Sequence, residues 1–321
     1  MKAIRVHAHG GPEVLQLEDV PVPAPKPGES LVRVTQAGVN YSDVYQRSGL
    51  NPTPLPFTPG VEGAGVVETS DGRLKAGTRV AWAGSPGAYA EMAAVPGWKL
   101  VPLPDTLDDR LGAAALMQGM TAQYLCESTW PVKPGQAALV HAGAGGVGLL
   151  LVQLLKAKGA TVLCTVSSAE KARLAAEAGA DQCIRYDEVD FVEAVREATA
   201  GQGVHVVYDS VGQATSAKSL SVVRPLGMLV LYGQSSGKAP PVDPMELCKQ
   251  GSVLLARPML AHYAADAQSL ADRAQRVLRW IDEGVLKLRV SASHPLRDAA
   301  QAHRELESRK TTGKLLLEVA A

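Results

Sequence analysis

A glycine-rich segment limits the folds open to this chain. Residues 141–148 read HAGAGGVG, in which Gly143, Gly145 and Gly148 have the spacing G-x-G-x-x-G. A strand-like stretch, AALVHA, leads into them, and a helix-like stretch, VGLLLVQLLKAKG, follows. In that setting the first glycine allows a tight turn, the second lets the backbone approach a diphosphate, and the third lets helix and strand pack closely. The segment predicts a dinucleotide site at a helix N-terminus, where unpaired N–H groups favour an anion. A tight turn that holds no ligand is the alternative.

Strand-like and helix-like segments alternate after this loop. Strands are expected at 161–166, 182–186, 204–209, 228–233 and 252–256, and helices at 167–179 and 191–200 between the first of them. Strands that are apolar on both faces indicate a parallel sheet covered by helices on both sides. Ser167 and Glu170 have the spacing of a capping box at the start of the first of these helices. The fold class is therefore α/β, with a doubly wound Rossmann sheet.

The end of the second strand indicates which dinucleotide binds. NAD enzymes place Asp or Glu there to hold the adenine ribose, whereas this chain has Val166-Ser167-Ser168. Lys171 follows in the first helical turn, where a cation is unfavourable unless an anion offsets the helix dipole. A serine and a lysine suit a 2′-phosphate and favour NADPH, although Lys171 as a solvated surface lysine is the alternative.

The first third of the chain has a different pattern. Short alternating stretches predict strands at 2–7, 31–36, 65–68 and 78–82, and proline-rich segments separate them. These features indicate a barrel-like β domain. Helices at 264–283 and 297–308 and a strand at 314–319 complete the chain. We expect a catalytic β-rich domain over 1–119 and 259–321 and an NADPH-binding domain over 120–258.

The composition indicates the cellular environment of the protein and excludes some classes of partner. Lys+Arg 32 balance Asp+Glu 32, so no global basic field attracts nucleic acid. Aromatic residues are only 4%, which argues against RNA binding by base stacking. Four separated cysteines favour a reducing compartment. The start of the chain lacks the apolar core of a signal peptide, and its densest apolar run is too short to cross a bilayer. We therefore expect a soluble cytoplasmic protein without membrane contact.

Several long motifs together resemble one family. They are GGPEVL (10–15), AGVNYSDVYQRSG (37–49), PGVEGAG (59–65), HAGAGGVG (141–148), VVYDSVG (206–212), ARP (256–258) and LESRKTTGK (306–314). Their order resembles the medium-chain dehydrogenase/reductases, and within them the zinc-free, zeta-crystallin-like quinone oxidoreductases. The resemblance covers essentially the whole chain and implies a GroES-like catalytic domain beside the Rossmann domain.

The resemblance also implies that the catalytic metal is missing. Zinc alcohol dehydrogenases of the family have a cysteine and a histidine where this chain has Asn40 and Val61. Neither side chain replaces a thiolate or an imidazole, and zinc needs three protein ligands before water completes the site. Without a Lewis acid, a conjugated acceptor such as a quinone or an enone is the suitable substrate, because hydrogen-bond donors at its oxygen suffice.

Resemblance places two catalytic residues beside the nicotinamide. Asn40 would position ribose or substrate through its amide, and Tyr45 would donate a hydrogen bond to the developing oxyanion. The alternative is that both are structural. Asp43 and Arg47 are expected at most to pair locally.

The family's cofactor contacts carry over to further positions. Those expected at the nicotinamide half are Tyr41, Ser42, Asp43 and Val44, with Thr121 and Tyr124 at the entry to the Rossmann domain. Gly146 and Val147 would meet the diphosphate, and Ser167, Lys171, Tyr186 and Arg309 the 2′-phosphate end. Ser210, the run Gly233, Gln234, Ser235 and Ser236, and the run Arg257, Pro258 and Met259 follow later strands.

The leading hypothesis is an NADPH-dependent quinone oxidoreductase. An NADPH-dependent alkenal or enone double-bond reductase is the second hypothesis, and a cofactor-holding protein with a binding or structural role is a third. If Lys171 and Arg309 both bind the 2′-phosphate, NADPH should be preferred over NADH by at least about tenfold. The apolar strand at 252–256 would leave a free sheet edge, which predicts a homodimer.

Overall fold

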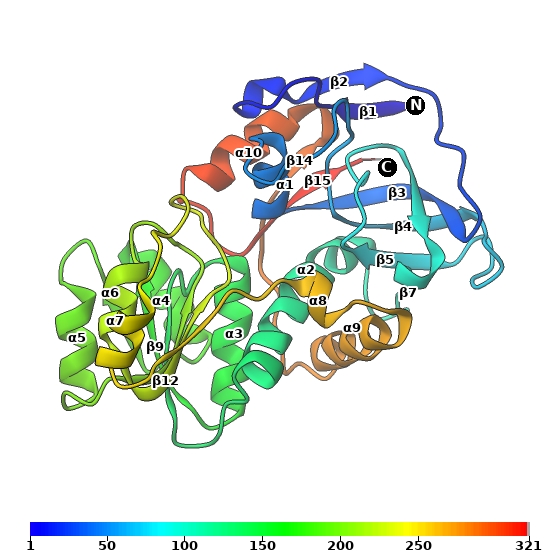
Figure 1. The fold of residues 1–321 in the computed structure, drawn as a ribbon. Helices are drawn as coiled ribbons and strands as arrows, with labels where there is room; N and C mark the ends of the chain where they lie inside the picture. The colour runs from blue at the N-terminus through cyan, green and yellow to red at the C-terminus, as the bar shows by residue number, and fades with distance from the viewer. Residues whose placement is uncertain (320–321) are drawn as a thin grey trace. The chain divides into compact units, whose positions relative to one another are not determined.

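The chain forms two units, each discontinuous in sequence (Figure 1). The computed structural model describes residues 1–319. Unit 1 comprises Met1–Met120, Tyr263–Gly284 and the segment from Leu288 onwards, and unit 2 comprises Thr121–His262 and Val285–Lys287. The helix α2, Asp109–Tyr124, and the helix α8, Leu260–Tyr263, contain two of the four points where the chain passes between the units, and the other two flank Val285–Lys287.

Unit 2 is built on a six-stranded parallel sheet of order β10-β9-β8-β11-β12-β13. This is the order 3-2-1-4-5-6 of a Rossmann fold, so the prediction of a doubly wound sheet is confirmed. The strands are β8 Ala137–Val140, β9 Thr161–Val166, β10 Gln182–Arg185, β11 Val204–Asp209, β12 Val223–Leu231 and β13 Leu254–Ala256. The helices are α3 Gly146–Ala157, α4 Ala169–Glu177, α5 Phe191–Ala198, α6 Ser216–Ser221 and α7 Pro244–Lys249, with a π-helical turn at Leu125–Thr129.

The central strands of unit 2 are apolar on both faces because helices cover both. Leu139, Leu163 and Val207 belong to one buried cluster with Phe191 and Val195 of α5. The alternate residues of the same strands, such as Val140 and Val206, are fully buried as well. This double burial explains why the sequence shows continuous apolar runs.

Unit 1 contains a seven-stranded sheet of order β14-β15-β3-β4-β5-β7, with β6 paired to β3, and a two-stranded sheet β1-β2. The strands are β1 Lys2–Arg5, β2 Gln16–Asp19, β3 Glu29–Val39, β4 Glu62–Thr69, β5 Arg79–Ala83, β6 Met92–Pro96, β7 Val101–Pro102, β14 Val290–Pro295 and β15 Lys314–Glu318. The helices are α1 Tyr41–Arg47, α9 Ala267–Asp282 and α10 Ala299–Glu307, with 3-10 turns at Pro12–Val14, Gly97–Lys99 and Leu296–Asp298.

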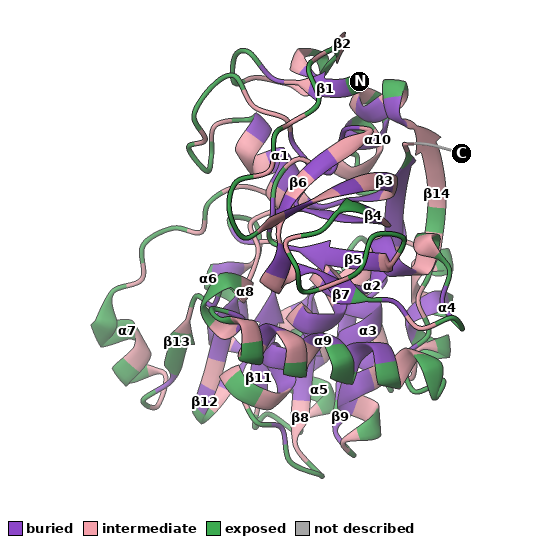
Figure 2. Ribbon diagram, turned by 90° about the vertical axis from the view of Figure 1, so that its right-hand side faces the viewer, coloured by how far each residue is buried: buried purple, intermediate pink, exposed green. Residues whose placement is uncertain are grey.

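The helix α9, expected at 264–283, buries one of its faces and exposes the other (Figure 2). Leu270, Ala274, Val277 and Leu278 are buried, a spacing that places them on one helical face. Asp266 caps its N-terminus, since its carboxylate accepts the backbone N–H of Ser269.

The prediction of a capping box at α4 was wrong by one residue. Ser168, not Ser167, is the N-cap, and its hydroxyl accepts the backbone N–H of Lys171 at 3.2 Å. Position N3 is therefore Lys171 rather than Glu170. The shift leaves the hydroxyl of Ser167 available for other contacts.

No strand was expected at β2, β6, β7 or β14. The sequence of β14, VSASHP, is polar and lacks a clear alternation, and its extended form follows from parallel pairing with β15. Among residues 1–319, no helix has the length and apolar character needed to cross a membrane.

Candidate functional site

The glycine loop between β8 and α3 is constrained by close packing. A Cβ atom at Gly143 would lie 2.6 Å from Cβ of Cys164, and one at Gly148 would lie 2.3 Å from the carbonyl oxygen of Ala142. Ala142 itself has a φ of 53°, a left-handed conformation that sharpens the turn. Glycine at the first and third positions is therefore required by the fold.

The second glycine of the loop is different. A Cβ at Gly145 would have one near neighbour, the carbonyl oxygen of Ala142 at 3.2 Å, so packing alone does not require glycine there. Gly145 is the N-cap of α3, and Gly146 and Val147, its first two residues, are half-buried. The first N–H groups of a helix lack intrahelical partners. This arrangement fits a diphosphate that approaches the backbone.

A buried polar network lies next to the glycine loop and connects the strand ends beside it. His141 bridges the hydroxyls of Thr165 and Ser219, each at 2.9 Å, and Ser219 donates to Asp209 at 2.8 Å. Burial lowers the pKa of His141, which favours the neutral ring. These side chains join the ends of β8, β9 and β11 to α6. Their signal in the sequence was a polar residue at the end of each apolar strand.

The structure brings together the residues predicted after β11 and β12. The carbonyl oxygen of Ser210 accepts the N–H of Ser235 at 3.1 Å, and a Cβ at Gly233 would lie 2.6 Å from that same oxygen. Ser236 donates its hydroxyl to the carbonyl of Val211 at 2.7 Å. Gln234 begins this turn, and its carbonyl accepts the N–H of Gly237 at 2.9 Å.

Ser167 and Lys171 also lie together. The Lys171 ammonium is 3.2 Å from the Ser167 hydroxyl, and burial lowers the pKa of Lys171. Tyr186 follows the neighbouring strand β10, and its N–H donates to the carbonyl of Val166 at 3.3 Å, so it lies at the same end of the sheet. Tyr186 as a residue is 51% exposed. A half-buried cation beside a hydroxyl donor suits a phosphate group.

The remaining predicted residues of unit 2 are more varied. Arg257 and Met259 are exposed after β13, and Pro258 between them is buried. Thr121 is half-buried, whereas Tyr124 is only 2% exposed and packs in the interior.

In unit 1, the amide of Asn40 is held by a buried ion pair. Its Nδ2 donates to Glu62 Oε2 at 3.0 Å and to the carbonyl of Gly38 at 3.2 Å, and its Oδ1 accepts from Lys314 Nζ at 2.7 Å. Both hydrogens of the amide are therefore used within unit 1. What remains for a ligand is acceptor capacity on Oδ1.

The ion pair itself was not anticipated. Lys314 Nζ lies 2.5 Å from Glu62 Oε2, and the two side chains are 1% and 0% exposed. The other carboxylate oxygen of Glu62 accepts the N–H of Met117 at 2.8 Å. The available signal was a glutamate between glycines and apolar residues, in PGVEGAG, where an unpaired carboxylate would be costly.

Asp43 is a second buried carboxylate, at the start of α1. It accepts the N–H groups of Asn40 and Val61, at 2.9 and 3.0 Å, and the hydroxyl of Tyr89 at 3.2 Å. Burial raises the pKa of Asp43 to about 7, although these hydrogen bonds oppose the rise. The expected local pairing with Arg47 was wrong, since Arg47 binds both carboxylate oxygens of Glu307 at 2.8 Å.

Asp43 belongs to a chain of hydrogen bonds whose direction is fixed. Arg47 Nη1 lies 3.4 Å from Nδ1 of His303 and can only donate, so the ring proton is on Nε2. Nε2 then donates to the Tyr89 oxygen at 3.1 Å, and Tyr89 donates to Asp43. Burial lowers the pKa of His303 to about 3, in agreement with a neutral ring. The chain holds α1 against α10.

The helix α1 carries the other predicted residues of unit 1. Tyr41 donates its hydroxyl to the carbonyl of Leu306 at 3.0 Å, and its ring centroid is 6.0 Å from that of Tyr45. Burial raises the pKa of Tyr41 to about 12, and the nearby charge of Arg309 opposes this rise. Val44 is buried.

Ser42 has an unmatched hydroxyl. Its oxygen is buried and has no hydrogen-bond partner among the described residues. A buried hydroxyl without a partner is costly. A ligand that hydrogen-bonds at α1 would satisfy it, which fits the expected cofactor contact.

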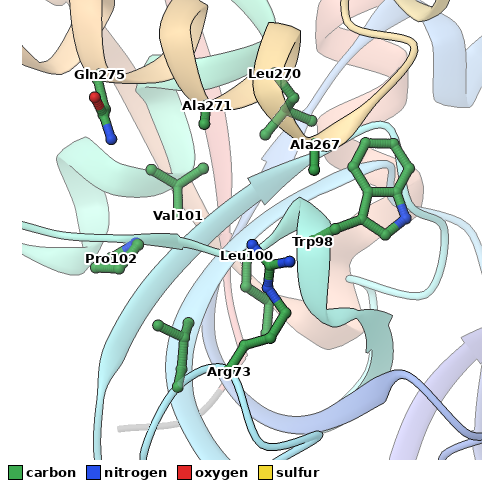
Figure 3. A pocket seen from close by; sticks show the side chains of 10 residues that line it. Arg73, Trp98, Leu100, Val101, Pro102, Ala267, Leu270, Ala271 and Gln275 are labelled. Atoms are coloured by element: carbon green, nitrogen blue, oxygen red, sulfur yellow. The ribbon is translucent and has the colours of Figure 1, made fainter.

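Unit 1 also contains a pocket of about 360 Å³ between α9 and the segment 98–102 (Figure 3). Arg73, Trp98, Leu270 and Gln275 are among its lining residues, and none of the predicted site residues is. Its lining has no carboxylate, imidazole or thiol, so it offers no acid–base group. Within residues 1–319, no group of three or more His, Cys, Asp and Glu side chains is arranged to hold a metal ion.

Two family profiles match the chain. The profile described as "Alcohol dehydrogenase GroES-like domain" matches residues 26–105, and the one described as "Zinc-binding dehydrogenase" matches residues 146–274. The "Quinone oxidoreductase" of Pseudomonas aeruginosa is 42% identical over 98% of this chain and 99% of its own. A "2-haloacrylate reductase" of a Burkholderia species is 41% identical over 97% of both. The structure of Escherichia coli quinone oxidoreductase complexed with NADPH has a TM-score of 0.96, at 40% identity, covering 99% of this chain and 100% of that one.

Proposed function

Because the chain belongs to the quinone oxidoreductases of the medium-chain dehydrogenase/reductase superfamily, we propose that it transfers reducing equivalents from NADPH to a quinone. The observation that carries this proposal is the glycine loop. It is packed tightly at Gly143 and Gly148 and open at Gly145, beside a half-buried pair of Ser167 and Lys171. Such a site fits a diphosphate followed by a 2′-phosphate.

The residues of unit 2 would hold the cofactor at its phosphates. Gly145, Gly146 and Val147 present the N-terminus of α3 to the diphosphate, and Ser167 and Lys171 bind the 2′-phosphate. Bound NADPH supplies the two electrons for the reduction. The contact of Arg309 with the 2′-phosphate stays a prediction.

In unit 1, we propose that Tyr45 donates a hydrogen bond to the carbonyl oxygen of the acceptor. Asn40 would act through its Oδ1, since its Nδ2 hydrogens are bound by Glu62 and Gly38. Ser42 would donate its buried hydroxyl to the cofactor. Conjugated acceptors spread the developing negative charge, so these neutral groups are sufficient.

The test is oxidation of NADPH by the purified protein with a panel of quinones and alkenals. Quinones should be reduced fastest, and detection of semiquinone radicals would distinguish one-electron from hydride transfer. The second candidate is an enone double-bond reductase, which the 41% identity to the 2-haloacrylate reductase favours. Faster turnover of alkenals or haloacrylates than of every quinone would replace the first function by the second.

We propose further that the reaction needs no metal. Asn40 and Val61 stand where the zinc enzymes of the family have ligands, and neither binds zinc well. Dialysis against a chelator should leave the rate unchanged. Loss of activity that added zinc restores would contradict this proposal.

We also propose a cytoplasmic homodimer. The strand β13 is the edge of the unit 2 sheet, and its Leu254 and Leu255 are 52% and 38% exposed. An apolar edge strand can pair with a copy of itself. Sedimentation should give a dimer at micromolar concentration, and a monomer would contradict the interface. The free cysteines support a reducing compartment.

A further inference from the structure

Two cysteines of unit 2 lie side by side. Cys164 on β9 and Cys183 on β10 are direct partners in the parallel register, and their sulfur atoms are 3.6 Å apart. Both are free thiols. Neighbouring strands are about 4.7–4.9 Å apart, which lies within the Cα separation of about 4.4–6.8 Å that a disulfide allows. The backbone can therefore accept a bond between them.

The two thiols differ in exposure and in acidity. Cys164 is fully buried, whereas Cys183 is half-buried on the edge strand of the sheet. The Cys164 thiol donates a hydrogen bond to the Cys183 sulfur, which lowers the pKa of Cys183 and raises that of Cys164. Cys183 is thus the thiol that a small oxidant can reach. As a thiolate, it can attack that oxidant.

Both thiols contact elements that form the proposed NADPH site. Cys164 fills the space beside Gly143, where an added Cβ would meet its Sγ at 2.8 Å. The Cys183 thiol donates to the carbonyl of Ala172 at 3.3 Å, in α4 and next to Lys171. One thiol therefore supports the diphosphate loop, and the other contacts the helix that carries the 2′-phosphate lysine.

We propose that Cys164 and Cys183 form an oxidisable dithiol that reacts with a hydroperoxide and, once joined, weakens NADPH binding. The Cys183 thiolate attacks the peroxide, which breaks the O–O bond and gives a sulfenic acid and an alcohol or water. The Cys164 thiol then attacks the sulfenic sulfur, and a disulfide forms with loss of water. Overall, two thiols lose two electrons and two protons, and the hydroperoxide is reduced.

The link to NADPH rests on the function proposed above and follows from the movement that the bond requires. The sulfurs must approach from 3.6 Å to about 2.05 Å. Cys164 then draws away from Gly143, and Cys183 loses its hydrogen bond to Ala172. Coupling between a modification and a ligand site is typically 5–150-fold, so we expect the Kd for NADPH to rise at least about fivefold.

The experiment uses the full-length protein, reduced and then treated with hydrogen peroxide. Peptide mass spectrometry should find the Cys164–Cys183 link, with loss of two hydrogens, and reduction with dithiothreitol should reverse it. NADPH titrations of the reduced and oxidised forms should show the fivefold difference. Cys183→Ser should give no link and no change in affinity on oxidation, whereas the matched variant Cys248→Ser, which alters an exposed thiol, should behave like the parent.

Several results would overturn the proposal. They are oxidation of Cys183 to a sulfinic acid without a link, a link that involves Cys126 or Cys248, or equal NADPH affinity of the two forms. Cys183→Ala provides the same test if the serine variant does not fold. If the reduced protein fails to bind NADPH, the proposed function fails with the affinity effect, while the mass measurement still decides whether the dithiol forms.

Discussion

Replacing Lys314 by methionine should destabilise unit 1 far more than the loss of an ordinary lysine. The ammonium group makes two hydrogen bonds, at 2.5 Å to Glu62 and at 2.7 Å to Asn40, and it is almost completely buried. Methionine fills a similar volume without the charge. Glu62 would then remain as a buried carboxylate without its cation.

The size of the effect follows from that unpaired carboxylate. Breaking one side of a buried ion pair costs about 3–5 kcal/mol, because the remaining charge is not compensated. Adding Glu62→Gln to Lys314→Met should recover roughly half of that loss, since the amide keeps an acceptor for the N–H of Met117. A surface pair gives the matched control: the side chains of Lys2 and Asp19 are 50% and 74% exposed, and Lys2→Met should cost at most about 1 kcal/mol.

Urea unfolding followed by tryptophan fluorescence measures these differences. Trp82 is fully buried in the core of unit 1 and reports its unfolding. A stability of Lys314→Met within about 1 kcal/mol of Lys2→Met, or a double variant less stable than Lys314→Met alone, would show that the buried pair is not responsible.

Three further predictions concern the proposed site and its surroundings. Lys171→Ala should raise KM for NADPH about tenfold and leave NADH kinetics nearly unchanged, because one charge-assisted bond to phosphate is lost; an equal effect on both cofactors contradicts the assignment. Tyr45→Phe should lower kcat at constant NADPH affinity, and an unchanged rate would remove its role as hydrogen-bond donor. The free energy of unfolding of Asp43→Asn should fall more steeply than that of the parent between pH 6.5 and 4. Urea midpoints measured at several pH values in this range test this. In the parent, the pKa of Asp43 is about 7 in the folded state, so the folded protein takes up this proton and gains stability as the pH falls through this range. The pKa of His303 is lowered to about 3, so only the unfolded protein takes up the histidine proton, which destabilises the fold. If the stability of parent and variant changed with pH in the same way, Asp43 would not offset the effect of His303.

The sequence predicted the elements whose signals are local. The strands of unit 2 are continuous apolar runs between turns, and the glycine spacing identified the loop between β8 and α3. Ser167 and Lys171 were predicted to serve the same phosphate, and they are close in sequence, with the Lys171 ammonium 3.2 Å from the Ser167 hydroxyl. The one-residue error at the cap of α4 arose because two adjacent serines could each serve as the N-cap.

Contacts between distant positions were not predictable in this way. Lys314 and Glu62 are 252 residues apart, and the local pattern at neither position indicates the partner. The amide of Asn40 was expected to position ribose or substrate, and this distant pair determines which of its atoms are available. The strand β14 was missed for the same reason, since its conformation depends on pairing with β15.

The position of β15 has a consequence for how the protein is made. This strand lies between β14 and β3, with Leu316 opposite Gly38, although it follows every other described strand in chain order. Unit 2 can close its sheet as soon as β13 has been synthesised. In unit 1, by contrast, the Gln36–Val39 end of β3 lacks its β15 partner, and Glu62 lacks its cation, until residues 314–318 emerge. Domains generally fold as units during synthesis. Ribosome-bound chains halted before β15 should therefore contain a protease-resistant unit 2 and a protease-sensitive unit 1.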